Sequence, residues 1–364
     1  SFTTWSQTLP SERKSIILRV LDVVKNRREE IIDWLIQESG STRFKANIEV
    51  DAVLGIINEA ITFPERMEIQ KLQSIDPTRK SHVVRKALGV IAVISPWNFP
   101  FHLSMRSVVT ALAIGNCVML KPASDTPITG GMLLAKIFEE AGLPKGLLSV
   151  LVGRGSIIGD AIAQHPLVRK ISFTGGTTTG RHLAHIAADK LITTSLELGG
   201  KSPTIVLPDA DVELAAKGVA YGIFSSAGQA CIAGSRLFIH SSLYDQFLTR
   251  LVEITKGLRV GHPEQAGVHL GPLVNDKHLQ SVDRYVQLAK SEGGQVLIGG
   301  EALTAGDYAK GSYYLPTIIT GLNNSAQTCQ EEIFGPVLVV MKYDNEQDLI
   351  AQANDSCFGL AAGI

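Results

Sequence analysis

The sequence predicts an α/β protein with two domains, and two observations support this prediction. Apolar runs such as "GVIAVIS" and "NCVMLKP" alternate with helical stretches from Gly89 onward, and a similar alternation begins again after Lys201. Near-continuous apolar strands separated by helices are typical of a parallel sheet covered on both faces. A chain of 364 residues is also too long for one simple core, so we expect two domains.

The N-terminal part reads as helices followed by a hairpin. Residues 11–38 form one predicted amphipathic helix, because Ile17, Val20 and Val24 lie near helical spacing. A second helical region runs from about residue 45 to 63. "SHVVRKAL" alternates like a strand beside the turn "SIDPTRK", which predicts a hairpin over residues 69–86.

The two α/β regions have predicted helices of ordinary length. They cover residues 103–114, 126–142, 156–165 and 177–188 in the first region, and 211–226, 242–257, 277–292 and 346–354 in the second. Strands of the second region are "SPTIVLP", "RLFIH", "QVLIGG", "LPTII" and "VLVVMKY". The hinge is expected within "LELGGKSP", residues 196–203.

Composition excludes several classes of partner. A formal net charge of -1 argues against nucleic acid or an anionic membrane surface, and the longest apolar runs are too short to span a bilayer. The four cysteines are widely spaced without a CxxC pair, so we expect neither a disulfide scaffold nor a metal site, and a cytoplasmic location. Because the chain lacks an initial Met and stops inside "GLAAGI", we expect the protein to continue past both ends.

Cys231, in "GQACIAGSR", is the candidate nucleophile. Cysteine is among the most buried residue types, so this thiol could simply fill a core. A reactive thiol needs a lowered pKa or a nearby base, and the nearest histidine is His240, at the end of a predicted strand. The small neighbours of Cys231 fit either interpretation.

Two further motifs carry candidate catalytic groups. Glu197 follows apolar residues in "LELGGK"; if buried there, its raised pKa would suit a general base. The alternative is a strand-edge glutamate that points to water. Asn98, in "ISPWNFPF", could donate a hydrogen bond into a cleft or satisfy the backbone of its own turn.

Three motifs could contact a nucleotide. The glycines of "SFTGGTTTG" would let an anion approach a helix N-terminus, although such a turn can also be purely structural. Lys121 ends a strand and could bind a ribose hydroxyl or phosphate, or could be a solvated lysine at the sheet rim. "EEIFGP" places Glu331 and Glu332 before an aromatic residue and a turn, which on its own reads as a charged loop.

Together and in this order, "PWNFP", "LKPASDTP", "SFTGGTTTG", "LELGGKSP", "GQACIAGSR" and "EEIFGPV" resemble the aldehyde dehydrogenase superfamily across essentially the whole chain. The resemblance implies a Rossmann-like cofactor domain of residues 1–68 and 88–199, an oligomerisation hairpin of residues 69–87, and a second α/β, catalytic domain of residues 200–364. It also implies a homodimer or homotetramer.

The resemblance assigns the catalytic roles. Cys231 would attack the aldehyde, Asn98 would hold the oxyanion with the Cys231 N–H, and Glu197 would activate the hydrolytic water. The implied cofactor residues, with no metal ligand among them, are Trp97, Lys121, Ser124, Gly175, Gly176, Thr179, Gly180, Leu198, Glu332 and Phe334.

Two positions depart from the family pattern. The family often has Glu where this chain has Ser124, and that carboxylate would bind a ribose 2′-hydroxyl and repel a 2′-phosphate. We therefore expect NAD as cofactor, with NADP tolerated. The family commonly has Ser at position 176, where this chain has Gly, and this difference should leave the phosphate approach intact.

The implied reaction is oxidation of an aldehyde to a carboxylate. The segments "ESGSTRFKANIE" and "KPASDTPITGG" are similar to those of the benzaldehyde and vanillin dehydrogenase branch, which favours an aromatic or bulky apolar aldehyde. The alternatives are acyl transfer to CoA, which Glu197 disfavours, a catalytically silent member of the family, and a cofactor-independent thiol hydrolase.

Overall fold

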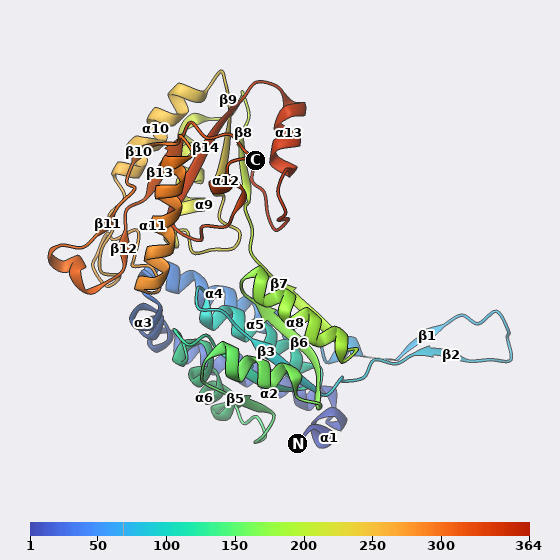
Figure 1. The fold of residues 1–364 in the computed structure, drawn as a ribbon. Coiled ribbons are helices and arrows are strands. Elements are labelled where there is room, and N and C mark those ends of the chain that lie inside the picture. Colours follow the sequence, from blue (N-terminus) through green and yellow to red (C-terminus); the bar gives the residue numbers. More distant parts are fainter. Residues whose placement is uncertain (68) are drawn as a thin grey trace. The chain divides into compact units, whose positions relative to one another are not determined.

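The computed structural model describes residues 1–67 and 69–364, which divide into two compact units. The first unit contains Ser1–Ser39 and Ala46–Glu197, and the second contains Gly40–Lys45 and Leu198–Ile364. Both units combine helices with a five-stranded sheet, as the α/β prediction requires (Figure 1). The three-domain division based on the sequence stays a prediction.

The sheet of the first unit is parallel throughout, in the order β5-β4-β3-β6-β7. Its strands are β3 (Val90–Ile94), β4 (Cys117–Lys121), β5 (Leu148–Val150), β6 (Val168–Thr174) and β7 (Thr193–Glu197). The central strand β3 is the most apolar, and its residues from Ile91 to Ile94 are buried. Helices separate these strands along the chain, as the alternating pattern predicted.

The helices of the first unit follow the predicted order, with one break. They are α1 (Phe2–Gln7), α2 (Pro10–Asn26), α3 (Arg28–Ser39), α4 (Arg43–Ala60, whose first three residues belong to the second unit), α5 (Pro100–Ala113), α6 (Leu133–Glu140), α7 (Asp160–Gln164) and α8 (Thr177–Asp189). The prediction of one helix over residues 11–38 was wrong, because Arg27 leaves the helical conformation with ψ of 15°. There its guanidinium binds Glu30 and reaches Glu140 of α6.

Two of the predicted helices begin with a wider turn. The turns η2 (Ile128–Met132) and η3 (Gly155–Gly159) are π-helical and lead into α6 and α7. A 3-10 turn, η1 (Glu65–Met67), follows α4.

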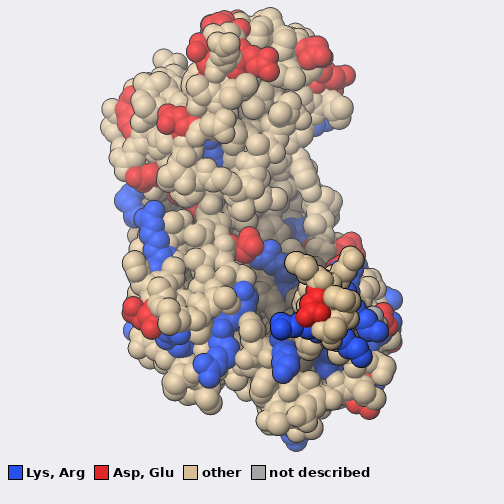
Figure 2. Space-filling view, turned by 90° about the vertical axis from the view of Figure 1, so that its right-hand side faces the viewer, with Lys and Arg blue, Asp and Glu red and all other residues tan. Residues whose placement is uncertain are grey.

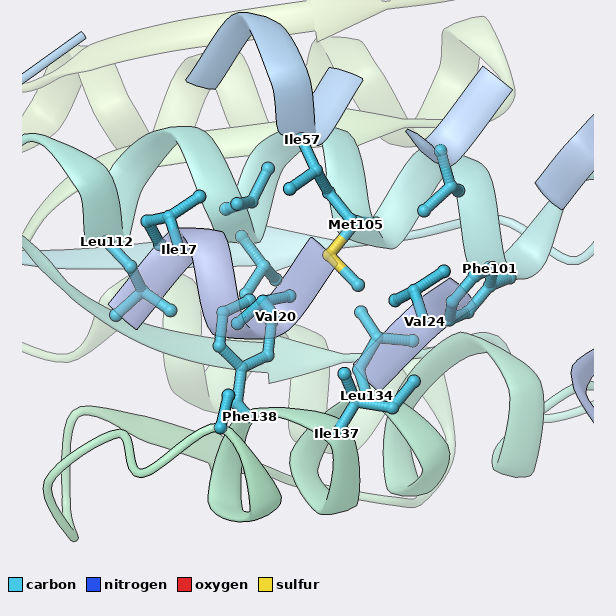
Figure 3. Packing of buried hydrophobic residues seen from close by; sticks show 14 of the residues in the cluster. Ile17, Val20, Val24, Ile57, Phe101, Met105, Leu112, Leu134, Ile137 and Phe138 are labelled. Carbon is cyan, nitrogen blue, oxygen red and sulfur yellow. The ribbon is translucent and has the colours of Figure 1, made fainter. Parts of the chain in front are cut away.

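The core of the first unit lies between helices and the sheet. Ile17, Val20 and Val24 on α2 pack with residues of α4, α5 and α6 (Figure 3). The three α2 residues lie at helical spacing, which is the pattern that the sequence shows. Phe101 and Met105 on α5 are fully buried in the same cluster.

The predicted hairpin is an antiparallel pair, β1 (Gln70–Leu72) and β2 (Ser81–Val83), that extends away from its unit (Figure 1). Its apolar side chains Leu72 and Ile75 are exposed. Basic side chains are also frequent in this segment, and Figure 2 views the molecule from the hairpin side.

The second unit contains a mixed sheet in the order β10-β13-β14-β9-β8, with β10 antiparallel at one edge. Its strands are β8 (Pro203–Val206), β9 (Arg236–His240), β10 (Gln295–Ile298), β13 (Thr317–Thr320) and β14 (Val337–Tyr343), and the short pair β11 (Ala302–Leu303) and β12 (Tyr313–Tyr314) lies apart. Its helices are α9 (Val212–Phe224), α10 (Tyr244–Lys256), α11 (Asp276–Ser291), α12 (Gln327–Gln330) and α13 (Glu346–Asn354), with the 3-10 turn η4 (Gly306–Lys310).

The second unit has its own core, centred on fully buried aromatic residues such as Phe224, Phe238 and Phe247. Across the described residues, no helix has both the length and the apolar character needed to cross a bilayer.

Candidate active site

The first unit contains a cavity of about 540 Å³ at the carboxyl ends of β3, β4 and β6. Ile94, Lys121 and Thr174 are the last residues of these strands, and all three line the cavity. Ligands of open parallel sheets bind at this end of the strands. The position of the cavity therefore indicates a ligand site.

The glycine turn after β6 forms one wall of the cavity. Gly175 and Gly176 line it, and Gly176 is the N-cap of α8. A Cβ at Gly175 would lie 2.6 Å from the Phe173 ring, whereas a Cβ at Gly176 would meet nothing within 4 Å. A serine could therefore replace Gly176 without a clash, and the free N–H groups of the helix start favour an anion.

Of the two other residues predicted from this turn, one lies on the wall. Thr179 lines the cavity. Gly180 is buried within α8, where its N–H donates to the Gly176 carbonyl at 3.1 Å, and it is not among the lining residues.

Lys121 is buried, with only 4% of its surface exposed, so the interpretation as a solvated rim lysine was wrong. Its stem is enclosed because β4 lies between β3 and β5, and burial lowers the pKa of its amine. Ser124, three residues further on, lines the cavity and donates from Oγ to the Gly153 carbonyl at 3.1 Å. Among the described residues that line the cavity, Asp160 is the one that carries a carboxylate.

These residues fit a dinucleotide. The cavity offers a helix N-terminus and a glycine turn for phosphates, and a buried amine for a ribose or phosphate oxygen. Ser124 itself presents a hydroxyl rather than a carboxylate to the cavity, while the neighbouring Asp125 interacts electrostatically with Lys121.

The turn "PWNFP" joins β3 to α5. Trp97 lines the cavity, while Asn98 is 6% exposed and lies outside the lining. Pro100 opens α5, where a missing N–H costs nothing, and so fixes where the turn ends.

Glu197 is the last residue of β7, and its side chain is exposed. Of the two interpretations that the sequence allowed, the structure therefore shows the strand-edge glutamate and not the buried carboxylate. β7 is the edge strand of its sheet, and its alternate residues Thr193, Ser195 and Glu197 form an exposed polar face. The apolar residues next to Glu197 in the sequence lie on the opposite face of the strand.

Cys231 lies in the second unit, in the turn between α9 and β9, and is half-buried. Cys117 and Cys329, by contrast, are buried in the two cores. Small residues around Cys231 allow close backbone contacts. A Cβ at Gly200 would lie 2.6 Å from the Cys231 carbonyl oxygen.

A second close approach fixes the start of the cysteine turn. Gly228 has φ of +69°, and a Cβ there would collide with the Gly335 carbonyl oxygen. The motifs "GQACIAGSR" and "EEIFGP" are therefore in direct contact within the second unit, although many residues separate them in the chain.

Glu332 connects the same motif to the "LELGGK" segment. Its carboxylate accepts a hydrogen bond from the Gly200 N–H at 3.1 Å and lies against Gly199. Burial raises the pKa of this carboxyl. Phe334 has φ of +59°, and its carbonyl accepts a hydrogen bond from His278 Nε2 at 2.8 Å. Leu198, which precedes these glycines, is half-buried.

Two basic residues of the second unit are buried beside these motifs. The Arg236 guanidinium donates to the carbonyls of Lys201, Gln352 and Ala353 and to Asn324 Oδ1, at 2.8 to 3.0 Å. The Lys201 amine has no hydrogen-bond partner among the described residues, and burial lowers its pKa to about 8.

The sequence analysis missed one polar pair on the cavity wall. His182 Nε2 lies 3.0 Å from Asp160 Oδ1, and both side chains line the cavity. The available signal was spacing, since Thr178, Thr179 and His182 share one face of α8. The position of Asp160 relative to that face could not be read from the sequence.

The fold and the cavity define a class, that of α/β enzymes with a nucleotide site at the carboxyl edge of a parallel sheet. The chain belongs to the aldehyde dehydrogenase family, which it matches over residues 1–364. It is thus an NAD(P)-dependent oxidoreductase that acts on aldehydes.

Three relatives illustrate this membership. A vanillin dehydrogenase of Corynebacterium glutamicum is 42% identical over 362 residues, which cover 99% of this chain and 73% of the relative. A D-glyceraldehyde dehydrogenase (NADP(+)) of Picrophilus torridus is 36% identical over 363 residues, with 100% and 73% covered. The crystal structure of an NAD-dependent benzaldehyde dehydrogenase from Corynebacterium glutamicum matches with a TM-score of 0.92 at 42% identity, covering 99% of this chain and 77% of that one.

Proposed function

We propose that this protein oxidises an aromatic or bulky apolar aldehyde to its carboxylate, with NAD as cofactor and NADP tolerated. The main support is the state of Cys231, a half-buried thiol in a turn of small residues that contacts both the "LELGGK" and "EEIFGP" motifs. Relatives named for vanillin and benzaldehyde support the aromatic substrate. Among the described residues the cysteines form no disulfide, which fits the cytoplasm, and the exposed apolar residues of the hairpin fit a homodimer or homotetramer.

The first chemical step belongs to Cys231. Its thiolate attacks the carbonyl carbon, a C–S bond forms, and the carbonyl electron pair moves onto oxygen. The Asn98 amide and the Cys231 N–H donate hydrogen bonds to that oxyanion. Burial of Asn98 favours this role, because a buried amide keeps a fixed orientation.

The nicotinamide, when bound, supplies the acceptor for the hydride that leaves the substrate carbon. Glu332, whose carboxylate is held by the Gly200 N–H, would act as a hydrogen-bond acceptor for the bound cofactor. Trp97 lines the nucleotide cavity. Lys121 and the turn of Gly175 and Gly176 hold the ribose and phosphates.

Glu197 completes the reaction. It takes a proton from water, the hydroxyl attacks the acyl carbon bound to Cys231, and the C–S bond breaks to return the thiolate. The assignment rests on the resemblance of the "LELGGK" motif to the family, and the exposed side chain of Glu197 has access to water. The product is the carboxylate.

One assay tests the function. Formation of reduced nicotinamide is followed with benzaldehyde, a short aliphatic aldehyde and a charged semialdehyde, with and without CoA, in the wild type and in Cys231→Ala. We expect turnover with the aromatic aldehyde that does not need CoA and is lost in Cys231→Ala. Unchanged turnover in Cys231→Ala would contradict the mechanism, and a preference for the semialdehyde would contradict the substrate class.

A further inference from the structure

A carboxylate lies on the buried face of α4, where the helix otherwise presents apolar side chains. Glu49 is 1% exposed, and Ala46, Val53 and Ile57, which lie at helical spacing from it, are fully buried. An ionisable side chain is rarely buried to this extent unless its polar atoms have partners. Glu49 is therefore expected to bind specific polar groups in the core of the first unit.

The partners of Glu49 are backbone amides at the start of α5. Its Oε1 accepts hydrogen bonds from the Phe101 N–H at 2.9 Å and from the His102 N–H at 3.1 Å. These are the second and third residues of the helix, and the first residue, Pro100, has no N–H. Glu49 thus supplies the acceptor that these two amides of the first turn lack within the helix itself.

The residue that precedes α5 cannot supply this acceptor. It is Phe99, whose side chain carries no oxygen, whereas Ser, Thr, Asp or Asn is preferred at the N-cap of a helix. A carboxylate at a helix N-terminus also interacts favourably with the helix dipole. The start of α5 therefore depends on a side chain that lies 52 residues earlier in the chain than Phe101.

The turn that carries Asn98 is held at both of its ends. At its start the Ser95 N–H donates to the Lys121 carbonyl at 3.1 Å, which ties the turn to β4. At its other end α5 begins at Pro100, and Glu49 binds the next two amides. Asn98 lies two residues before the helix and is buried, so the position of its amide depends on where α5 starts.

We propose that Glu49 is a positioning residue of the active site, which fixes the start of α5 and thereby holds the Asn98 amide where the oxyanion forms. This inference rests on the proposed function, from which it takes the role of Asn98. Removal of an oxyanion donor lowers kcat about 10²- to 10³-fold, and a displacement of about 1 Å can cost about 10²-fold. Loss of the Glu49 contacts should therefore cost less than loss of Asn98 itself.

The experiment compares two substitutions of Glu49. Glu49→Gln keeps an oxygen that can accept both N–H groups, whereas Glu49→Met has a similar volume without that oxygen. At saturating NAD, we expect Glu49→Met to lower kcat/KM for benzaldehyde about 10- to 100-fold, and Glu49→Gln to lower it less than about threefold. The Kd for NAD, measured by calorimetry, should change less than about threefold in both variants. Should Glu49→Met fail to fold, Glu49→Asp, whose shorter side chain withdraws the carboxylate, replaces it with the same expectation.

A double-mutant cycle with Asn98→Ala separates positioning from a general structural role. If Glu49 acts through Asn98, Glu49→Met should lower kcat/KM less than about threefold in the Asn98→Ala background, because the amide that it positions is already absent. The same factor in both backgrounds would overturn the proposal. A Glu49→Gln variant that loses as much activity as Glu49→Met would also overturn it.

Glu38→Met is the matched control. Glu38, on α3, makes the same kind of contact in the first unit, since its carboxylate accepts hydrogen bonds from the N–H groups of Ile128 at 2.7 Å and Thr129 at 2.6 Å, at the start of η2. Both Met variants should lower the free energy of unfolding. Glu38→Met should nevertheless keep kcat/KM for benzaldehyde within about threefold at saturating NAD, because it does not adjoin the Asn98 turn. Equal losses of activity in the two variants would overturn the proposal.

Two readouts separate this proposal from the proposed function. Hydrogen exchange reports on the α5 start without any aldehyde, and the Phe101 and His102 amides should exchange faster in Glu49→Met than in Glu49→Gln. An Asn98→Ala variant with unchanged turnover would contradict the oxyanion role in the proposed function, and with it the catalytic purpose of the Glu49 contacts. An inactive Asn98→Ala variant beside a fully active Glu49→Met variant would leave the proposed function standing and overturn this inference alone.

Discussion

Replacing Arg236 by Met should destabilise the second unit more than any surface arginine change. Arg236 ends the cysteine motif and begins β9, and 1% of its surface is exposed. Its guanidinium donates four hydrogen bonds to three carbonyls and one amide oxygen. Met fills a similar volume but has no donor, so these acceptors would remain buried without their partner.

The magnitude follows from the contacts. A net hydrogen bond contributes about 1 kcal/mol, so four bonds give about 4 kcal/mol. The Gln352 carbonyl keeps a second donor, Asn324 Nδ2 at 3.0 Å, and removing a buried charge recovers part of its desolvation cost. We therefore expect a loss of about 3 kcal/mol in the free energy of unfolding.

Denaturant unfolding of Arg236→Met measures this loss, and hydrogen exchange locates it. The amides of residues 198–203 and 350–356 should exchange faster, because Arg236 binds the Lys201 and Ala353 carbonyls. Arg250→Met is the control, since its ion pair with Glu213 is exposed and such pairs contribute little to stability. A loss in Arg236→Met no larger than in this control would refute the reasoning.

Three further predictions concern backbone, charge and cofactor. Gly228→Ala should lose more than about 2 kcal/mol of unfolding free energy, because φ is +69° and the new Cβ would meet the Gly335 carbonyl. The control Gly222→Ala, in open space on α9, should be neutral or stabilising. Denaturant unfolding measures both variants, and equal effects would contradict this prediction. Lys201→Met should be more stable than the wild type by up to about 3 kcal/mol at pH 7, because below pH 8 the folded protein must bury a charge that the unfolded chain keeps in water. This advantage should shrink as the pH rises from about 8 to 10.5, and an advantage that does not change with pH would exclude charge burial as its cause. Ser124→Glu should raise the KM for NADP at least about tenfold and leave that for NAD unchanged, whereas parallel changes in both constants would contradict a role at the ribose.

The alternation of apolar strands and helices was enough to predict both sheets. β3 and β4 are buried parallel strands, and such strands read as near-continuous apolar runs, whereas β6 alternates buried and more exposed residues. The break at Arg27 was not predictable in the same way, because apolar spacing continues from α2 into α3. The break depends on contacts of the arginine with Glu30 and Glu140, and Glu140 lies far along the chain.

Candidate residues could be found by motif, but their environments could not. Lys121 is buried and Glu197 is exposed, the reverse of what their neighbours in the sequence suggest. Burial depends on which strand lies beside which, and the strand order places β4 inside the sheet and β7 at its edge. Asp160 and His182 were missed because only the packing of α7 and α8 brings them together.

The short segment Gly40–Lys45 has a consequence for any attempt to divide the chain. It belongs to the second unit although it precedes most of the first, and the Gly40 carbonyl lies close to Gly271 while the Phe44 and Tyr221 rings meet edge to face. A fragment that starts at Leu198 would therefore lack part of its own packing. During synthesis this segment leaves the ribosome long before its partners exist, so the second unit can complete its contacts only after the rest of the chain has followed.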